Sequence, residues 1–189
     1  ILVGDVSGKG IASALTMAKL TSDFRLLAIR QKEPARLVEE INHLFCLRSR
    51  RGMFVTLVYL VLDPGNGEVD FINAGHVPPV LWNAARDRFE LLKKPGGPPV
   101  GIVPGQVYSP GKLHLEPRDC LLLSTDGLIE AKNPQGDRLG WERLESAVRR
   151  GDSRVETVYA RTMESLGQFV EDCPQADDIT LVLVGVEES

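Results

Sequence analysis

Strand-like segments joined by turn signals fill the middle of the chain, and helical patterns lie on both sides of them. Between residues 53 and 124, short runs rich in Val, Leu, Phe and Tyr alternate with Gly- and Pro-rich stretches such as Asp63-Pro64-Gly65-Asn66-Gly67. Apolar runs separated by short turns of this kind are typical of antiparallel hairpins. Strands grouped in one part of the chain and helices in others predict an α+β fold.

Two hairpins and two further strands are predicted in this central part. Residues 53–62 pair with 68–73, and residues 80–82 pair with 89–92, while 107–115 and 120–124 are the remaining strands. Residues 95–105 contain four glycines and four prolines and are predicted to form a loop. A loop of this length is either a lid over a site or a rigid connector.

The flanking segments have helical periodicity. A long helix is predicted from residue 11 to about Arg30, with an apolar face formed by Ile11, Leu15, Ala18, Phe24, Leu27 and Ile29. Pro34 suits the first turn of a second helix, whose apolar stripe consists of Leu37, Val38, Ile41, Leu44 and Phe45. Two more helices are predicted over 141–149 and 155–170, followed by a last, buried strand over 179–186.

Composition limits the class of protein. The 189 residues fit one globular domain over 1–189, and the net charge of −4 argues against nucleic-acid binding. The three cysteines form no CxxC pair, which excludes a zinc knuckle and indicates a reducing, cytoplasmic location. No apolar run approaches the ~18 residues of a membrane span. Residue 1 is Ile within a strand already under way, so we expect the chain to be part of a longer protein.

Aspartates recur at the ends of apolar strands. Asp5 follows the first strand, Asp126 follows residues 121–125, and Asp177 and Asp178 precede the last strand. Any one of them alone could be an ordinary turn residue. A charge beside an apolar strand is unfavourable unless it is exposed or neutralised, however, and carboxylate oxygens are the ligands that Mg²⁺ and Mn²⁺ prefer. Their recurrence predicts that Asp5, Asp126 and Asp177 converge on a divalent-metal site.

Lys9 stands immediately before the first helix, in the segment Gly4-Asp5-Val6-Ser7-Gly8-Lys9-Gly10. The glycine spacing, and Gly10 where a nucleotide-binding P-loop has Ser or Thr, exclude that motif. The helix dipole disfavours a cation at this end. Lys9 is therefore either simply solvent-exposed or accompanied by a bound anion.

Several motifs occur in a fixed order along the chain. They are Gly4 to Gly10 with Ala14-Leu15 and Met17-Ala18, Asn73-Ala74-Gly75-His76 with Pro78-Pro79, Thr125 to Ala131, Gly140 to Leu144, and Asp177-Asp178-Ile179-Thr180. Together they resemble the SpoIIE-like branch of the phosphatase 2C superfamily, which consists of bacterial metal-dependent serine/threonine protein phosphatases. The resemblance implies a four-layer α-β-β-α sandwich of antiparallel sheets flanked by helices.

The resemblance also implies a site with two Mn²⁺ or Mg²⁺ ions and a metal-bound water as nucleophile, so that no protein side chain is the nucleophile. Asp5 would bridge the metals beside the Val6 carbonyl, and Asp126 and Asp177 would bind one of them. Gly127 and Asp178 would be neighbours of the ligands, and Gly8 and Lys9 would bind the substrate phosphate. His76 would be either a wall of the site or a hydrogen-bonded turn histidine.

By the same resemblance, the substrate would be a phosphorylated regulatory protein of the anti-anti-sigma (STAS) type, and a sensor or response-regulator domain would precede this one. The family's upstream Gly-Gly-Asp segment is not in the sequence, so we expect the fold to lack its first strands and the chain alone to have little activity. Ser7 replaces the histidine of eukaryotic relatives, which leaves the leaving-group acid open; a metal-bound water is one candidate.

Two other functions remain compatible with the sequence. One is a catalytically silent phosphatase-fold domain that binds regulators. The other is a metal-dependent hydrolase of small phosphoesters, which shares the chemistry and differs in substrate.

Overall fold

The computed structural model describes residues 1–48, 52–93 and 96–186. The chain divides into two compact units, one comprising Ile1–His76 with Lys94–Leu113 and the other Val77–Lys93 with His114–Ser189. Each unit contains a sheet, helices and a hydrophobic core of its own. The predicted α+β class is therefore confirmed, while the prediction of a single domain over 1–189 stays a prediction.

The sheet of the first unit is built around three antiparallel strands. In order these are β1 (Leu2–Val6), β2 (Val55–Leu62) and β3 (Glu68–Ala74), with the predicted turn between β2 and β3. Two short strands, β6 (Gly96–Gly97) and β7 (Gly111–His114), also pair with β3. β7 is the only described strand within the longer one predicted over 107–115.

The predicted 95–105 loop is partly tied to this sheet. In its described part, β6 runs parallel to β3, and Val55 and Val100 exchange two backbone hydrogen bonds of 2.9 and 2.8 Å. The sequence could not show these bonds, since they join residues more than forty positions apart. Backbone pairing of this kind favours the connector interpretation over the lid.

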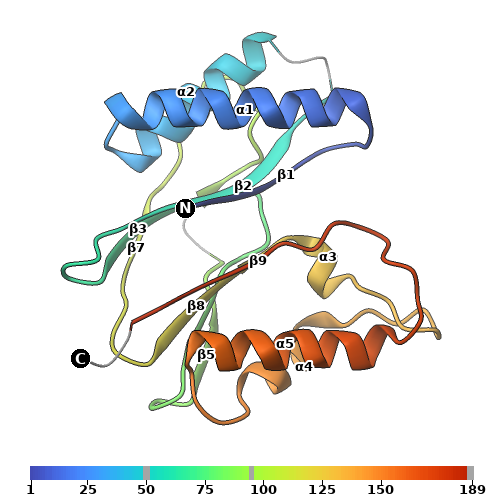
Figure 1. Ribbon diagram of the computed structural model, residues 1–189. Helices are drawn as coiled ribbons and strands as arrows, with labels where there is room; N and C mark the ends of the chain where they lie inside the picture. Colours follow the sequence, from blue (N-terminus) through green and yellow to red (C-terminus); the bar gives the residue numbers. More distant parts are fainter. Residues whose placement is uncertain (49–51, 94–95, 187–189) are drawn as a thin grey trace. The chain divides into compact units, whose positions relative to one another are not determined.

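Helices α1 (Ile11–Arg30) and α2 (Pro34–Arg48) lie on one face of this sheet (Figure 1). The predicted stripe of α2 is confirmed, with Leu44 half-buried and the rest buried. Between helices and sheet lies a core whose members include Val6, Leu20, Phe24, Leu37, Ile41, Val55, Leu57, Ile72 and Tyr108.

The predicted apolar face of α1 is confirmed for Phe24 and Leu27 and wrong for its other members. Ile11, Leu15 and Ile29 are 81%, 67% and 72% exposed, whereas Leu20 and Phe24 are buried. Met17 and Leu27 pack partly against the same core, so the buried stripe follows 17, 20, 24 and 27. Apolar residues occur on more than one side of α1, and periodicity alone did not identify which side contacts the sheet.

The second unit has an antiparallel sheet in the order β5-β4-β8-β9. The strands are β4 (Val80–Asn83), β5 (Arg88–Leu91), β8 (Asp119–Ser124) and β9 (Leu181–Gly185). A short helix α3 (Asp126–Ile129), which the sequence did not predict, follows β8 directly. α4 (Gly140–Val148) and α5 (Val155–Val170) lie side by side along this sheet (Figure 1).

Burial in the second unit corrects one prediction. β9 was expected to be buried, but it pairs only with β8 at the sheet edge and is half-buried over most of its length. By contrast, Cys120 is fully buried within a core that includes Val80, Trp82, Leu122, Leu128, Leu144, Val158 and Phe169. Burial, followed by the charges of Asp119 and Glu156, raises the pKa of the Cys120 thiol to about 12, which keeps it protonated.

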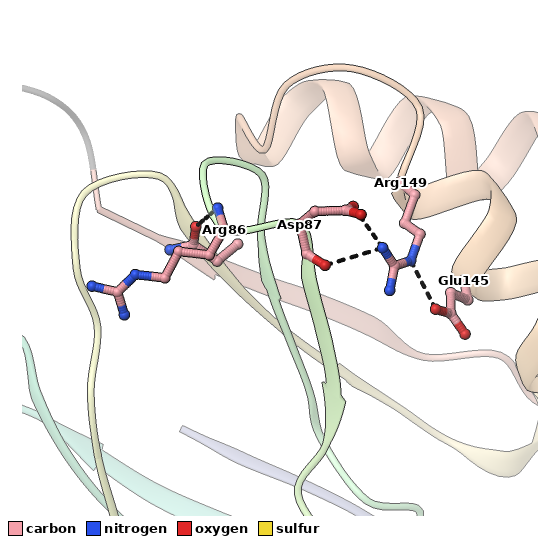
Figure 2. Close-up of polar contacts among 5 residues, drawn as sticks. Arg86, Asp87, Glu145 and Arg149 are labelled. Carbon is pink, nitrogen blue, oxygen red and sulfur yellow. Dashed lines mark hydrogen bonds and ion pairs between the residues drawn. The ribbon is translucent and has the colours of Figure 1, made fainter.

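Arg149 joins the β4–β5 turn to the end of α4 (Figure 2). Its Nε donates to Glu145 Oε1 at 2.7 Å, and its Nη1 donates to the Asp87 carbonyl at 3.1 Å and to Asp87 Oδ1 at 2.5 Å. The guanidinium also lies 5.5 Å from the centre of the Trp82 ring.

Over the described residues, no helix is long and apolar enough to cross a membrane.

Candidate metal centre

Asp5 lies inside β1 rather than after it, because the strand continues to Val6. Its partner across the sheet is Thr56 in β2, and the Asp5 side chain is exposed, whereas Val6 is buried in the core. Backbone pairing with β2 therefore fixes the position of the Asp5 backbone, from which the carboxylate extends. An exposed carboxylate on a well-paired strand suits a hard divalent cation.

The segment after β1 is fixed by Ser7. Its backbone N–H donates to the Phe54 carbonyl at 2.9 Å, and its Oγ accepts the Phe54 N–H at 2.9 Å. Gly8 and Gly10 have φ angles of +89° and +90°, a region that residues with a Cβ rarely adopt. Between these two glycines Lys9 is exposed, at the start of α1. The first turn of α1 contains no acidic residue, and no side chain caps it.

The Asn73-Ala74-Gly75-His76 motif forms a closed turn at the end of β3. The Asn73 side chain accepts the His76 N–H at 2.8 Å and donates to the His76 carbonyl at 3.1 Å. Gly75 has a φ of +67°, and a Cβ on it would lie 2.5 Å from Pro99 Cδ. The turn directs the imidazole toward β2, where Nδ1 and Thr56 Oγ1 are hydrogen-bonded at 2.8 Å.

In the second unit, Thr125 holds two predicted site segments together. Its Oγ1 donates to the Asp178 carbonyl at 3.0 Å and accepts the Thr180 N–H at 2.9 Å, while its own N–H donates to the Thr180 carbonyl at 3.1 Å. Gly127 also lies close to the Asp178 backbone, since a Cβ on Gly127 would be 2.4 Å from the Asp178 carbonyl oxygen. The backbones that carry Asp126 and Asp177 are therefore neighbours.

The carboxylates of this second unit face solvent. Asp126, Asp177 and Asp178 are all exposed, whereas Gly127, the residue after Asp126, is buried. Asp177 Oδ1 accepts the Asp178 N–H at 3.0 Å, which restricts the Asp177 side chain. The roles of Asp177 as a ligand and of Asp178 as its neighbour stay predictions.

The predicted site residues thus form two groups. Asp5, Val6, Gly8, Lys9 and His76 belong to the first unit, and Asp126, Gly127, Asp177 and Asp178 to the second. Within the described ranges, no three His, Cys, Asp or Glu side chains form a ready metal-binding cluster. Neither unit alone has a complete site, and convergence of Asp5 with the other two ligands stays a prediction.

Sequence reasoning missed the residues that hold the predicted ones. Asn73 and Thr125 were noted only as members of motifs, without a role, and Thr56 was not noted, because threonine is common in strands and asparagine in turns. The positions of Thr56 and Thr125 beside the predicted ligands become apparent from the register of β1 on β2 and from the contact between residues 125 and 178.

Among known proteins, relatives that match this chain over nearly its whole length include two bacterial proteins. It is 27% identical over 191 residues to the phosphoserine phosphatase RsbP of Bacillus subtilis, covering 99% of this chain and 45% of RsbP. It is 26% identical over 212 residues to protein IcfG of Synechocystis, covering 97% of this chain and 33% of IcfG. The chain therefore spans less than half the length of these relatives.

Solved structures share the fold. The phosphatase 2C domain of SpoIIE from Bacillus subtilis matches with a TM-score of 0.81 and 17% identity, over 98% of this chain and 53% of that one. The catalytic domain of the serine/threonine phosphatase PstP, solved with two manganese ions, matches with a TM-score of 0.68 and 14% identity, over 99% of this chain and 87% of that one. The phosphatase 2C-like fold implied by the motifs is confirmed.

The family model described as Stage II sporulation protein E matches residues 1–187. This match covers both units and all the motifs that carry the site residues. The chain belongs to the SpoIIE family of phosphatase 2C-like domains.

Proposed function

We propose that the chain is the catalytic domain of a metal-dependent serine/threonine protein phosphatase. The observation that carries the proposal is that Asp5, Asp126 and Asp177 are exposed and are attached to backbone fixed by hydrogen bonds. A silent relative would have no reason to keep charged side chains in these places, because exposed aspartates beside apolar strands contribute nothing to the core.

In the proposed site, Asp5 with the Val6 carbonyl, Asp126 and Asp177 bind two Mn²⁺ or Mg²⁺ ions. When bound, such a pair lowers the pKa of water and neutralises charge on the phosphoryl group. The protein's own contribution is to place the ligands. β1 and β2 fix Asp5, and Thr125 fixes the segments that carry Asp126 and Asp177.

The proposed substrate is phosphoserine or phosphothreonine on a regulatory protein of the anti-anti-sigma (STAS) type. The name of RsbP, a phosphoserine phosphatase, supports the chemistry. Because the chain covers 45% of RsbP, a regulatory domain such as a sensor or response regulator in the same polypeptide is part of the proposal.

One experiment separates this function from its two rivals. The full-length protein is assayed with a serine-phosphorylated STAS-type protein and with p-nitrophenyl phosphate, each in Mn²⁺ and in EDTA. We expect Mn²⁺-dependent turnover with kcat/KM much higher for the phosphoprotein. Equal or better use of p-nitrophenyl phosphate would indicate a small-phosphoester hydrolase, and no turnover of either substrate would indicate a silent interaction domain.

Lys9 is expected to contribute to substrate binding. It is exposed at the start of α1, beside Gly8, where backbone N–H groups and the helix dipole favour an anion. Lys9→Ala should raise KM for the phosphoprotein more than it lowers kcat, because uniform binding is lost, and Lys9→Arg should retain most function. Steady-state kinetics of the full-length variants measure both.

A matched control for Lys9 is Lys32→Ala, an exposed lysine beyond the other end of α1. The helix rises about 1.5 Å per residue, so its two ends are roughly 30 Å apart, and we expect no change. A collapse of kcat at constant KM in Lys9→Ala would place Lys9 in the chemical step. No change in either parameter would mean that it is merely exposed to solvent.

A further inference from the structure

We propose that Thr56 is a positioning residue for the Asp5 carboxylate and that His76 sets the direction of its hydroxyl. The proposal rests on the proposed function, in which Asp5 is a metal ligand. It adds to that function a chain of three side chains, His76–Thr56–Asp5, that lies wholly within the first unit.

The register places Thr56 directly opposite Asp5. Ile1 and Leu60 exchange two backbone hydrogen bonds of 2.8 and 2.9 Å, and hydrogen-bonded pairs recur at every second position of an antiparallel ladder. Asp5 and Thr56, four residues further along, are therefore again a hydrogen-bonded pair. Their side chains extend from the same face with Cβ atoms about 5 Å apart, within reach of a hydroxyl–carboxylate hydrogen bond.

The Thr56 hydroxyl is held from its other side by His76, at 2.8 Å from Nδ1. His76 cannot easily move, because Asn73 binds both its backbone N–H and its carbonyl, and Gly75 packs against Pro99. The imidazole is also almost entirely buried. The hydrogen bond restricts the Thr56 side chain, so the turn that ends at His76, twenty residues after Thr56, would fix the hydroxyl that lies opposite Asp5.

The chemistry of the three groups gives the proton positions. A hydroxyl has one proton to donate, and an ionised carboxylate can only accept. When Asp5 is an ionised ligand, the Thr56 proton therefore points to Asp5, and His76 Nδ1–H donates to Thr56 Oγ. This hydrogen bond would orient the Asp5 carboxylate, whose remaining lone pairs would hold the cations. Hydrogen bonds of this kind to a ligand orient it, and their removal typically lowers metal affinity 10- to 100-fold.

The test measures Mn²⁺ affinity of the full-length protein, by the electron paramagnetic resonance signal of free Mn²⁺. Thr56→Val, which removes the hydroxyl at nearly constant volume, is expected to weaken Mn²⁺ binding about tenfold, and Thr56→Ser should restore most of it. The control is Thr21→Val, another half-buried threonine, whose hydroxyl donates to the Met17 carbonyl within α1. We expect this control to bind Mn²⁺ as the unaltered protein does.

Two His76 variants test the role of the imidazole separately. His76→Leu removes the Nδ1 hydrogen bond, whereas His76→Asn places a side-chain amide near the same point. We expect weakened Mn²⁺ binding only in His76→Leu, and no further loss when it is combined with Thr56→Val. If circular dichroism shows that Thr56→Val is unfolded, His76→Leu and His76→Asn test the proposal in its place.

The variant Asp5→Asn distinguishes a failure of this inference from a failure of the proposed function. If Asp5→Asn abolishes Mn²⁺ binding while Thr56→Val and His76→Leu bind normally, Asp5 is a ligand and the positioning role of Thr56 is wrong. If Asp5→Asn itself binds Mn²⁺ normally, the assignment of Asp5 as a ligand is wrong. Loss in Thr56→Val that Thr56→Ser does not restore would also overturn the proposal, since the hydroxyl would not be the cause.

Discussion

Asp5→Ala in the full-length protein is expected to lower kcat on a phosphoprotein by at least about a thousandfold. Asp5 is the ligand proposed to be shared by both cations, so its loss removes the activation of water and the charge neutralisation together. These effects are each several kcal/mol, and each 1.4 kcal/mol corresponds to about tenfold in rate. The measurement is kcat in saturating Mn²⁺, with the folded state checked by circular dichroism.

Asp70→Ala is the matched control for this loss. Asp70 is also a partly exposed aspartate on a strand of the first unit, and it is ion-paired with Lys112 at 3.1 Å. Surface pairs of this kind contribute at most about 1 kcal/mol to stability, so we expect normal activity. If Asp5→Ala kept near-normal turnover while Asp70→Ala behaved as expected, Asp5 would not be a ligand.

The sequence predicted the elements whose signals are local. The Pro34 start and apolar stripe of α2, and the turn at residues 63–67 that joins β2 to β3, were confirmed. These depend on residues close together in sequence. The β6 pairing, the exposed side of α1 and the edge position of β9 depend on partners far along the chain, and there the prediction was wrong or incomplete.

The residues of the candidate site also divide into those with a local sequence signal and those that depend on distant partners. Asp5, Asp126 and Asp177 were found from their places beside apolar strands, because a charge there is conspicuous. Thr56 was missed, and Thr125 was noted only as the start of a motif, since a threonine in or after a strand is unremarkable until its partner is known. Their importance comes from His76 and Asp178, which are brought beside them only by the fold.

Gly127→Ala is expected to damage both stability and activity through one contact. Gly127 is the buried second residue of α3, and a Cβ on it would lie 2.4 Å from the Asp178 carbonyl oxygen and 3.1 Å from the carbonyl carbon. These are backbone atoms, which cannot turn aside as a side chain can. Either α3 or the segment that carries Asp177 must therefore move away.

That movement should separate Asp126 from Asp177, because Thr125 and Gly127 are the contacts that hold the two segments together. Overpacking of this kind costs about 1–3 kcal/mol, which corresponds to a lower Tm by roughly 2–12 °C for a chain of this size. A displacement of catalytic groups by about 1 Å can reduce the rate a hundredfold. We therefore expect kcat to fall by about that factor in Gly127→Ala, with the phosphoprotein as substrate.

Gly167→Ala provides the contrast, since it makes the same chemical change in the same unit. Gly167 lies in α5 with nothing within 4 Å of an added Cβ, and alanine is favoured over glycine in a helix by about 1 kcal/mol. Its Tm should stay the same or rise, and its kcat should not change. Wild-type Tm and kcat in Gly127→Ala would mean that the two segments separate without cost, and that their close contact does not position the Asp126 and Asp177 carboxylates.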